Sequence, residues 1–260
     1  MDVTLDLNCD LGEGVDAWEP GVVGLDQELL GVVTSANLAC GGHAGDERTM
    51  VCVARAAAAR GVALGAHVSY VDREHFGRRF LDVPPDELRA QVAAQLELVS
   101  GAAAAQGARI TYVKPHGALY NAIVHHEEHA AAVLDAMDSA SVGSLPVVGL
   151  PGSAVLAEAR RRGFRGVAEA FADRGYRADG TLVPRGQDGD LLIDERAVAE
   201  RVVRIATERR VRAVDGSDVA LDVETVCVHS DTPGAVALAR QVRAELASAG
   251  VTVVPFAGLP

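Results

Sequence analysis

Short apolar segments alternate with longer amphipathic segments along the whole chain, and this alternation limits the folds that the chain can adopt. Strands are expected near residues 3–9, 35–40, 62–68, 109–114, 145–150, 166–171 and 223–229, with a further short strand at 251–255. Helices are expected near residues 45–60, 85–106, 118–138, 153–162, 194–210 and 233–249. Alternation of this kind predicts a mainly parallel sheet covered by helices.

A closed barrel fits this number of strands better than an open sheet. Seven or eight strand–helix units indicate a β/α barrel, and an open, doubly wound sheet is the alternative. A GxGxxG or GxxxxGK[ST] motif would favour the open sheet, and the sequence contains neither. With 260 residues, about half of them apolar, we expect an α/β fold with one barrel domain over residues 1–260.

Charge and cysteine content limit the partners and the compartment. A formal net charge of −12 argues against binding nucleic acid or anionic lipid through a broad basic surface. The acidic N-terminal residues do not resemble a signal peptide, and no apolar run approaches the roughly 20 residues of a membrane span. The four cysteines form no C-x-x-C pair, as is typical of reduced thiols. We therefore expect a cytoplasmic protein without a membrane or nucleic-acid partner, and a homo-oligomer remains open.

Side chains capable of chemistry collect where the expected strands end. In strand order they are Asn8, Asp10 and Glu13; Asn37, His43 and Asp46; His67; Lys114 and His116; Glu169, Asp173 and Arg174; and His229 and Asp231. The C-terminal ends of parallel strands meet on one face, where barrel enzymes carry their active sites. Helix capping is the alternative role for Asp46, Asp231 and Thr232.

Lys114, in the stretch "YVKPHGALYN", is the only lysine of the chain. Surface positions generally accept arginine in place of lysine, so one retained lysine indicates a site where a compact point charge is needed. Its place at the end of the fourth strand predicts that it faces the cavity, two residues before His116.

Two further groups lie away from the strand ends. The stretch "HHEEH" at 125–129 matches the H-x-x-E-H pattern of some zinc peptidases. Because it falls inside the helix expected at 118–138, we expect a solvated helix face outside the barrel. The long loop after the third strand carries His75, Arg78 and Arg79, and it is expected to act as a lid or to bind an anion, with plain surface arginine as the alternative.

Eight motifs occur in order across nearly the full chain: "LNCDLGEG", "SANLACGGHAGD", "GAH", "FGRR", "VKPHGALYN", "EAFADR", "LVPR" and "CVHSDTPG". Together they resemble the LamB/YcsF family. The resemblance implies a distorted seven-stranded β/α barrel of the glycoside hydrolase/deacetylase type. It also implies the role of the A subunit in a prokaryotic ATP-dependent 5-oxoprolinase, which with its B and C subunits converts 5-oxo-L-proline to L-glutamate. The chain departs from the family pattern in "GAHVSYVD" and at Ser230.

Opening a lactam requires an activated carbonyl, a positioned water and a proton for the leaving nitrogen. Phosphorylation of the amide oxygen by ATP would supply the activation. As hypotheses, Asp10 with His43 or His67 acts as general base, Lys114 stabilises developing negative charge, and His116 or His229 delivers the proton. Glu169, Asp173 and Asp231 would orient these groups. The residues expected to bind the substrate are Asn8, Glu13, Asn37, Arg78 and Arg174.

The same residues allow other readings. Because the chain has no recognisable phosphate loop, ATP with Mg²⁺ is expected to be bound largely by the partner subunits. Asp10, His43 and His67 are of the right types to bind Zn²⁺ or a similar ion in a metal-dependent amidohydrolase or deacetylase that acts without ATP. A non-catalytic, substrate-binding subunit is the third alternative.

Overall fold

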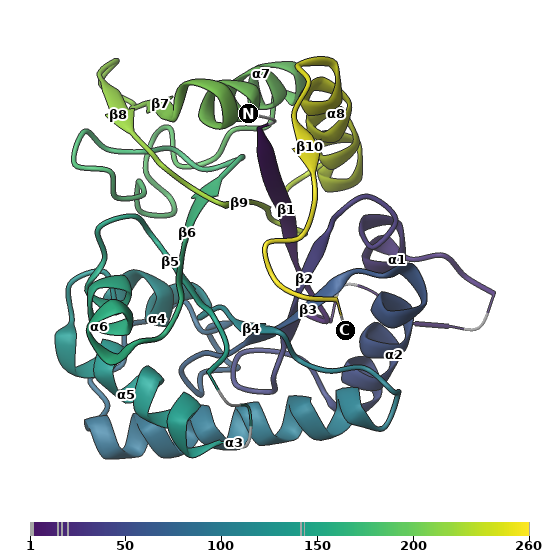
Figure 1. The fold of residues 1–260 in the computed structure, drawn as a ribbon, viewed down its shortest axis with the longest axis vertical. Coiled ribbons are helices and arrows are strands. Elements are labelled where there is room, and N and C mark those ends of the chain that lie inside the picture. Colours follow the sequence, from purple (N-terminus) through teal and green to yellow (C-terminus); the bar gives the residue numbers. More distant parts are fainter. Residues whose placement is uncertain are drawn as a thin grey trace.

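The computed structural model describes residues 3–14, 16, 18–19, 21–140, 142 and 144–259. Within these residues, seven parallel strands close into a barrel because β1 pairs with both β2 and β9. The barrel strands are β1 (Thr4–Leu11), β2 (Ser35–Ala39), β3 (Ala63–His67), β4 (Tyr112–Val113), β5 (Val147–Gly149), β6 (Gly166–Phe171) and β9 (Thr225–Val228). Figure 1 shows this ring of strands with the helices arranged around it. The expected seven-stranded β/α barrel is confirmed.

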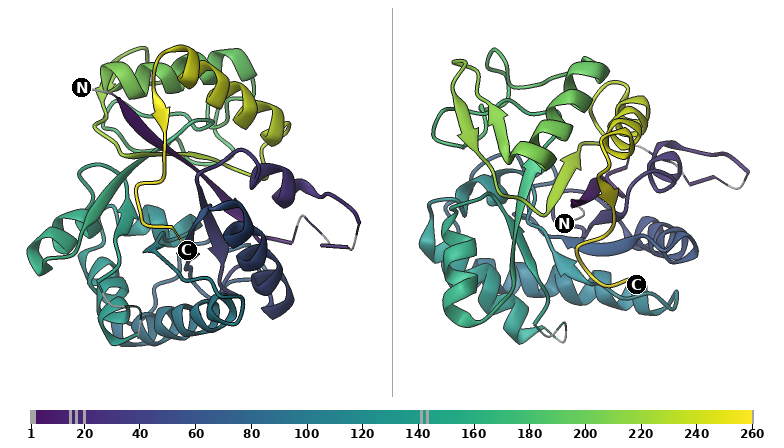
Figure 2. Two further views of the ribbon diagram at one scale, coloured as in Figure 1. Left: turned by 45° about the vertical axis from the view of Figure 1, so that its right-hand side comes forward. Right: turned by 45° about the horizontal axis from the view of Figure 1, so that its top comes forward.

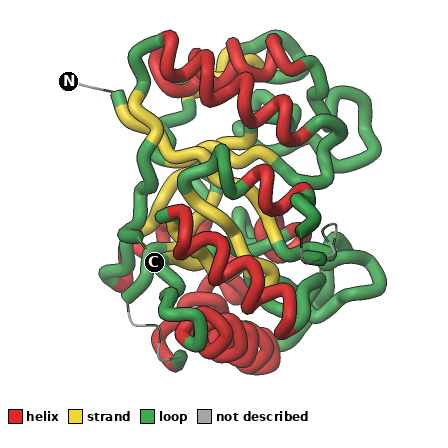
Figure 3. Tube along the Cα trace, turned by 90° about the vertical axis from the view of Figure 1, so that its right-hand side faces the viewer, coloured by secondary structure: helices red, strands yellow, loops and turns green. Residues whose placement is uncertain are grey.

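Helices surround the barrel on its outside, as the turned views show (Figures 2 and 3). They are α1 (Leu25–Leu29), α2 (Glu47–Arg60), α3 (Pro85–Ala104), α4 (Gly117–Ala122), α5 (Glu127–Ser139), α6 (Ala154–Arg162), α7 (Glu195–Glu208) and α8 (Ala235–Ser248). Asp46 caps α2 by accepting a hydrogen bond from the Thr49 amide, so its capping role is confirmed. Asp231 and Thr232 do not cap α8, which begins after Gly234 without a side-chain cap. None of the described helices is long and apolar enough to cross a membrane.

Strand β1 alternates between apolar and polar residues with a period of two. Its leucines and Cys9 are buried in the main hydrophobic core, whereas Asp6, Asn8 and Asp10 bond to side chains of other barrel strands. The barrel therefore encloses a polar network, which extends to the C-terminal ends of the strands.

The opposite end of the barrel is filled by side chains. The short strand β10 (Thr252–Val253) pairs with the beginning of β1, and the chain then brings the Phe256 ring to within 4.8 Å of the Tyr112 ring centroid. Tyr112 itself fills the space above Gly65, where a Cβ atom would lie only 2.1 Å from the tyrosine ring. This packing leaves the C-terminal strand ends as the place for a site.

The structure differs from the sequence prediction in two elements. The helix expected at 118–138 is broken into α4 and α5, because the carbonyl groups of Ile123 and Val124 accept hydrogen bonds from the amides at the start of α6. The antiparallel hairpin of β7 (Arg210–Arg212) and β8 (Asp218–Ala220) was not predicted, since three-residue strands rich in charged side chains carry little periodic signal.

Candidate active site

A cavity of about 660 Å³ opens at the C-terminal ends of the strands. Its size falls within the range of small-molecule sites. The ionisable residues among those that line it are Asp10, Glu13, His67, Arg78, Lys114, His116, His125, Arg174, Arg177, Arg185, His229 and Asp231. Most of the residues predicted from the strand ends are thus brought together around one space.

Lys114 lies at the floor of this cavity and is almost fully buried. Its Nζ atom lies 3.1 Å from Asp10 Oδ1, 3.0 Å from Glu169 Oε1 and 3.1 Å from Cys227 Sγ. Burial opposes the charge on Lys114, but the surrounding Asp10 and Glu169 carboxylates outweigh it and raise its pKa well above the ordinary value. Lys114 is therefore a fixed cation facing the cavity, as its position in the sequence predicted.

Asp10 bridges Lys114 and His67, with Oδ1 3.3 Å from His67 Nε2. Burial opposes its ionisation, but the contacts with His67 and Lys114 prevail and hold the pKa of Asp10 well below its ordinary value. A carboxylate with such a low pKa is a weak base at neutral pH. The structure thus disfavours Asp10 as the general base and indicates that it positions its two neighbours.

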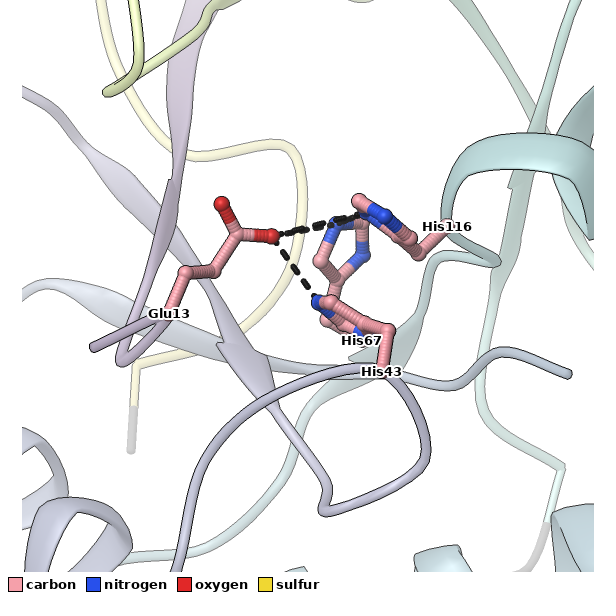
Figure 4. A group of neighbouring side chains, drawn as sticks. All are labelled: Glu13, His43, His67 and His116. Carbon is pink, nitrogen blue, oxygen red and sulfur yellow. Dashed lines mark hydrogen bonds and ion pairs between the residues drawn. The ribbon is translucent and has the colours of Figure 1, made fainter. Parts of the chain in front are cut away.

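Four side chains next to Asp10 form a group that we call the Glu13–histidine cluster: Glu13, His43, His67 and His116. They come from four different strand ends and point toward one another (Figure 4). Glu13 Oε1 lies 2.9 Å from His43 Nε2 and 3.4 Å from His116 Nδ1. The metal set considered as an alternative from the sequence, Asp10 with His43 and His67, differs from this group, in which Glu13 supplies the carboxylate and His116 joins.

Burial lowers the pKa of both His43 and His116 well below the ordinary histidine value. Burial also raises the pKa of the Glu13 carboxyl. His43 and His116 are thus neutral rings beside one carboxyl group, and the members of the cluster other than His43 reach the cavity. The place of Glu13 in this cluster differs from the substrate-binding role expected from the sequence.

The loop between β3 and α3 closes over these histidines. Phe76 has a left-handed backbone (φ 55°), which directs its carbonyl oxygen to within 2.9 Å of His116 Nε2. At the next residue, Gly77, a Cβ atom would lie 2.8 Å from His43 Cβ. Arg78 then forms an ion pair with Asp231, which also lies 3.7 Å from Arg185. The loop thus packs on the histidines and carries Arg78 to the cavity wall, whereas its expected role as a lid stays a prediction.

On the other side of the cavity, His229 is held by Asp173. His229 Nδ1 lies 2.9 Å from Asp173 Oδ1, and the hydroxyl of Thr232 donates to the same carboxylate. Burial opposes a charge on His229, but Asp173 outweighs it and raises the pKa of His229. Asp231, which was expected to orient catalytic groups, instead pairs with the two arginines at the cavity mouth. The Ser230 hydroxyl is buried and has no hydrogen-bond partner among the described residues.

Three predicted site residues lie beneath the cavity instead of lining it. Asn8, Asn37 and Glu169 are buried inside the barrel, where Asn8 bonds to Glu169 and Asn37 bonds to Asp10. Asn8 and Asn37 were expected to bind the substrate, but in the structure they bond to Lys114 and Asp10 and hold this pair in place. Arg174 lines the cavity, but its guanidinium is occupied by the carbonyl groups of Val183 and Asp190.

The HHEEH stretch is a solvated helix face only in part, because Glu127 and Glu128 are exposed in the first turn of α5 but the last histidine is not. Residue His126 caps α5, and His129 is buried with its ring nitrogens bonded to the Tyr70 hydroxyl and the Val83 carbonyl. The prediction failed for His129 because the helix break turns this segment toward the loop after β3. Two arginines of the cavity, Arg177 and Arg185, were not selected from the sequence, although the "LVPR" motif contains Arg185.

Fold and site place the chain in the class of β/α-barrel enzymes, which carry their chemistry at the C-terminal strand ends. Within that class, the chain belongs to the LamB/YcsF family, whose model matches residues 5–260.

Known proteins resemble this chain at two levels. It is 52% identical to the A subunit of the 5-oxoprolinase of Cutibacterium acnes, over 95% of this chain and 97% of that protein. It is 40% identical to the lactam utilization protein of Thermus thermophilus, whose crystal structure superposes with a TM-score of 0.88 over 97% of this chain and all of that one. A deacetylase, T48, solved with its substrate, shares the fold at 11% identity, with a TM-score of 0.51 over 97% of this chain and 88% of that one.

Proposed function

We propose that this chain is the A subunit of an ATP-dependent 5-oxoprolinase, which opens 5-oxo-L-proline to L-glutamate together with its B and C subunits. The full-length match at 52% identity to the A subunit of a known 5-oxoprolinase carries the proposal. The cavity agrees with it, because a fixed cation, a histidine with a raised pKa and several arginines surround one space. Since the reaction consumes ATP, we propose the cytoplasm as its compartment.

The groups at the cavity can be matched to the steps of ring opening. Lys114 stabilises negative charge on the lactam oxygen or on a phosphoryl group attached to it. The attacking water is placed beside the Glu13–histidine cluster, gives a proton to the Glu13 carboxylate and bonds through its oxygen to the carbonyl carbon, and the carbon–nitrogen bond then breaks. Where the lactam oxygen carries a phosphoryl group, a second water releases it from the resulting acyl phosphate as phosphate. His229, kept protonated by Asp173, delivers a proton to the leaving nitrogen.

The cavity mouth suits anionic ligands. Arg78 and Arg185 share the single carboxylate of Asp231, so guanidinium groups remain available for the substrate carboxylate or for phosphate. We propose that the carboxylate of 5-oxo-L-proline binds at Arg78 and Arg185. ATP with Mg²⁺ would bind where this mouth meets the partner subunits, since the barrel has no phosphate loop of its own.

Glutamate formation from 5-oxo-L-proline tests the proposal. The purified chain is expected to be nearly inactive alone and to form glutamate and ADP when the cognate B and C subunits and MgATP are added. Robust turnover by the chain alone without ATP would contradict the proposal and favour a metal-dependent amidohydrolase. Unchanged turnover of the complex with Asp10→Ala, Lys114→Ala and His116→Ala, each made singly, would leave the barrel with substrate binding as its only role.

A further inference from the structure

The outward-facing ring nitrogens of the Glu13–histidine cluster are bonded to fixed protein acceptors. His67 Nδ1 lies 2.9 Å from the Lys114 carbonyl oxygen, and His116 Nε2 lies 2.9 Å from the Phe76 carbonyl oxygen. A carbonyl group can only accept a hydrogen bond, so both of these nitrogens carry a proton. With one proton on each ring, His67 Nε2 and His116 Nδ1 therefore carry lone pairs, and both atoms lie inside the cluster.

His43 is held in the same way by a hydroxyl group. Its Nδ1 lies 3.1 Å from Ser69 Oγ, and the Ser69 hydroxyl donates its own proton to the Tyr70 carbonyl oxygen at 2.9 Å. Ser69 Oγ consequently accepts from His43 Nδ1, which leaves a lone pair on His43 Nε2. This lone pair faces Glu13 Oε1 at 2.9 Å.

Four acceptor atoms thus lie within 4.8 Å of one another in one buried place, where the His43 and His116 rings are stacked. His67 Nε2 and His116 Nδ1 lie 3.1 Å apart, although neither has a proton to give to the other. Lone pairs that face each other at this distance, shielded from water, are costly unless a positive species lies between them. The geometry therefore requires a cation or additional protons at this point.

Four of the six spacings among these atoms are close to those around a small tetrahedral ion, and all six are within 4.8 Å. Ligands about 2.05 Å from a central Zn²⁺ ion lie roughly 3.3 Å from one another. In the cluster, the contacts of Glu13 Oε1 with the three histidines measure 2.9, 3.4 and 3.9 Å, and the contact between His67 and His116 measures 3.1 Å. These edges scatter evenly around the expected value.

Protons satisfy the cluster less well than a metal ion does. A second proton on His67 would be donated to Asp10 Oδ1 at 3.3 Å, but it would leave His43 and His116 facing Glu13 as acceptors. A proton on Glu13 Oε1 could then serve only one of these two rings. One divalent ion satisfies all four donor atoms at once.

We propose that Glu13, His43, His67 and His116 bind a divalent transition-metal ion, with Zn²⁺ as the best match for three imidazoles and one carboxylate. The bonds of the outer ring nitrogens to Lys114, Phe76 and Ser69 are the supporting contacts that hold such ligands in orientation. When bound, the ion supplies a Lewis acid beside Lys114. The inference rests on the donor geometry and stands whether or not the chain opens a lactam.

Metal binding by the purified chain, without partners or ATP, tests this inference. The chelator-stripped chain is expected to take up one equivalent of Zn²⁺ by elemental analysis. With Co²⁺ it should show the intense visible bands of a tetrahedral site. Glu13→Gln and His116→Gln should each remove stoichiometric binding. Ser69→Ala, which keeps all four donors, should retain one equivalent but weaken the affinity about 10- to 100-fold.

The chain offers a matched control in its second histidine group. Asp82, His126 and His129 also lie close together, but both ring nitrogens of His129 are already bonded to protein atoms. His126→Ala should therefore leave the Zn²⁺ equivalent in place. Failure of the folded wild-type chain to bind Zn²⁺ near neutral pH would overturn the inference, and so would binding that survives Glu13→Gln and His116→Gln but is lost with His126→Ala.

Discussion

Individual side chains in this site are held by several partners at once, and Lys114 shows what that implies. Its ammonium group is surrounded by Asp10, Glu169, Asn8 and Cys227, each within 3.2 Å. A compact ion with rotatable donors fits such a cage, whereas a planar guanidinium is larger and presents its donors in a fixed fork. The retained lysine therefore reflects the shape of its surroundings as well as their charge.

Lys114→Arg should keep the fold and the charge yet lower turnover by at least about 100-fold, because the charge is displaced from the position where it stabilises the transition state. Overpacking of the cage should also cost about 1–3 kcal/mol in the free energy of unfolding. Steady-state kinetics of the assembled complex and denaturant unfolding measure the two effects. Arg79→Lys, at an exposed position of the loop between β3 and α3, serves as control. Near-wild-type turnover of Lys114→Arg would make the lysine incidental.

Asp173 sets the pH dependence at the other side of the cavity. The pKa of His229 is raised above its ordinary value of 6.5, and a proton donor works only below its pKa, so turnover should fall as the pH rises through this raised value. Asp173→Asn removes the electrostatic attraction that raises the pKa of His229 against the effect of burial. The fall in turnover at high pH should then occur about 1–3 pH units lower. The pH profile of kcat, with the NMR titration of His229, measures the shift. As a control, Asp72→Asn, beside His75, should leave the pH of this fall unchanged. If Asp173→Asn also left it unchanged, a group other than His229 would be the proton donor.

At the scale of elements, the loop between β3 and α3 shapes one side of the cavity, to which it contributes Arg78 and Phe80. Its left-handed turn at Phe76 and Gly77 packs on the histidine rings and fixes the path of the chain up to Arg78. Such a turn has no periodic pattern, so the sequence showed only that a loop with arginines was present. The contacts that make it part of the site depend on residues from the ends of β2, β4 and β9.

Arg78→Ala should raise KM for 5-oxo-L-proline about 10- to 100-fold while kcat changes little, because a charge-assisted hydrogen bond to the substrate carboxylate is lost equally in the ground and transition states. Steady-state kinetics of the complex measure this split. Arg79→Ala, at the neighbouring position but absent from the cavity wall, is the matched control. An unchanged KM, or a loss confined to kcat, would remove Arg78 from carboxylate binding.

Across the whole molecule, the direction of access follows from how the barrel ends are filled. Phe256 and Tyr112 pack the N-terminal end, so reactants must approach from the C-terminal strand ends. Although the chain carries a net charge of −12, Arg78, Arg177 and Arg185 gather at that cavity. Local positive charge of this kind can attract an anionic ligand that the overall charge would repel.

The sequence by itself determined the alternation of strands and helices, which favoured a barrel of seven or eight units, and the positions of the chemically capable residues at the strand ends; the count of seven strands came from the family resemblance. These features are local, because strand and helix periods and the direction of a parallel strand place such residues without knowledge of their neighbours. Only the tertiary structure decided their partners. It paired Glu13 with His43, moved Asn8 and Asn37 beneath the cavity, and buried His129 at a helix break. These outcomes depend on contacts between residues far apart in the chain, which side-chain packing and desolvation select and periodicity cannot encode.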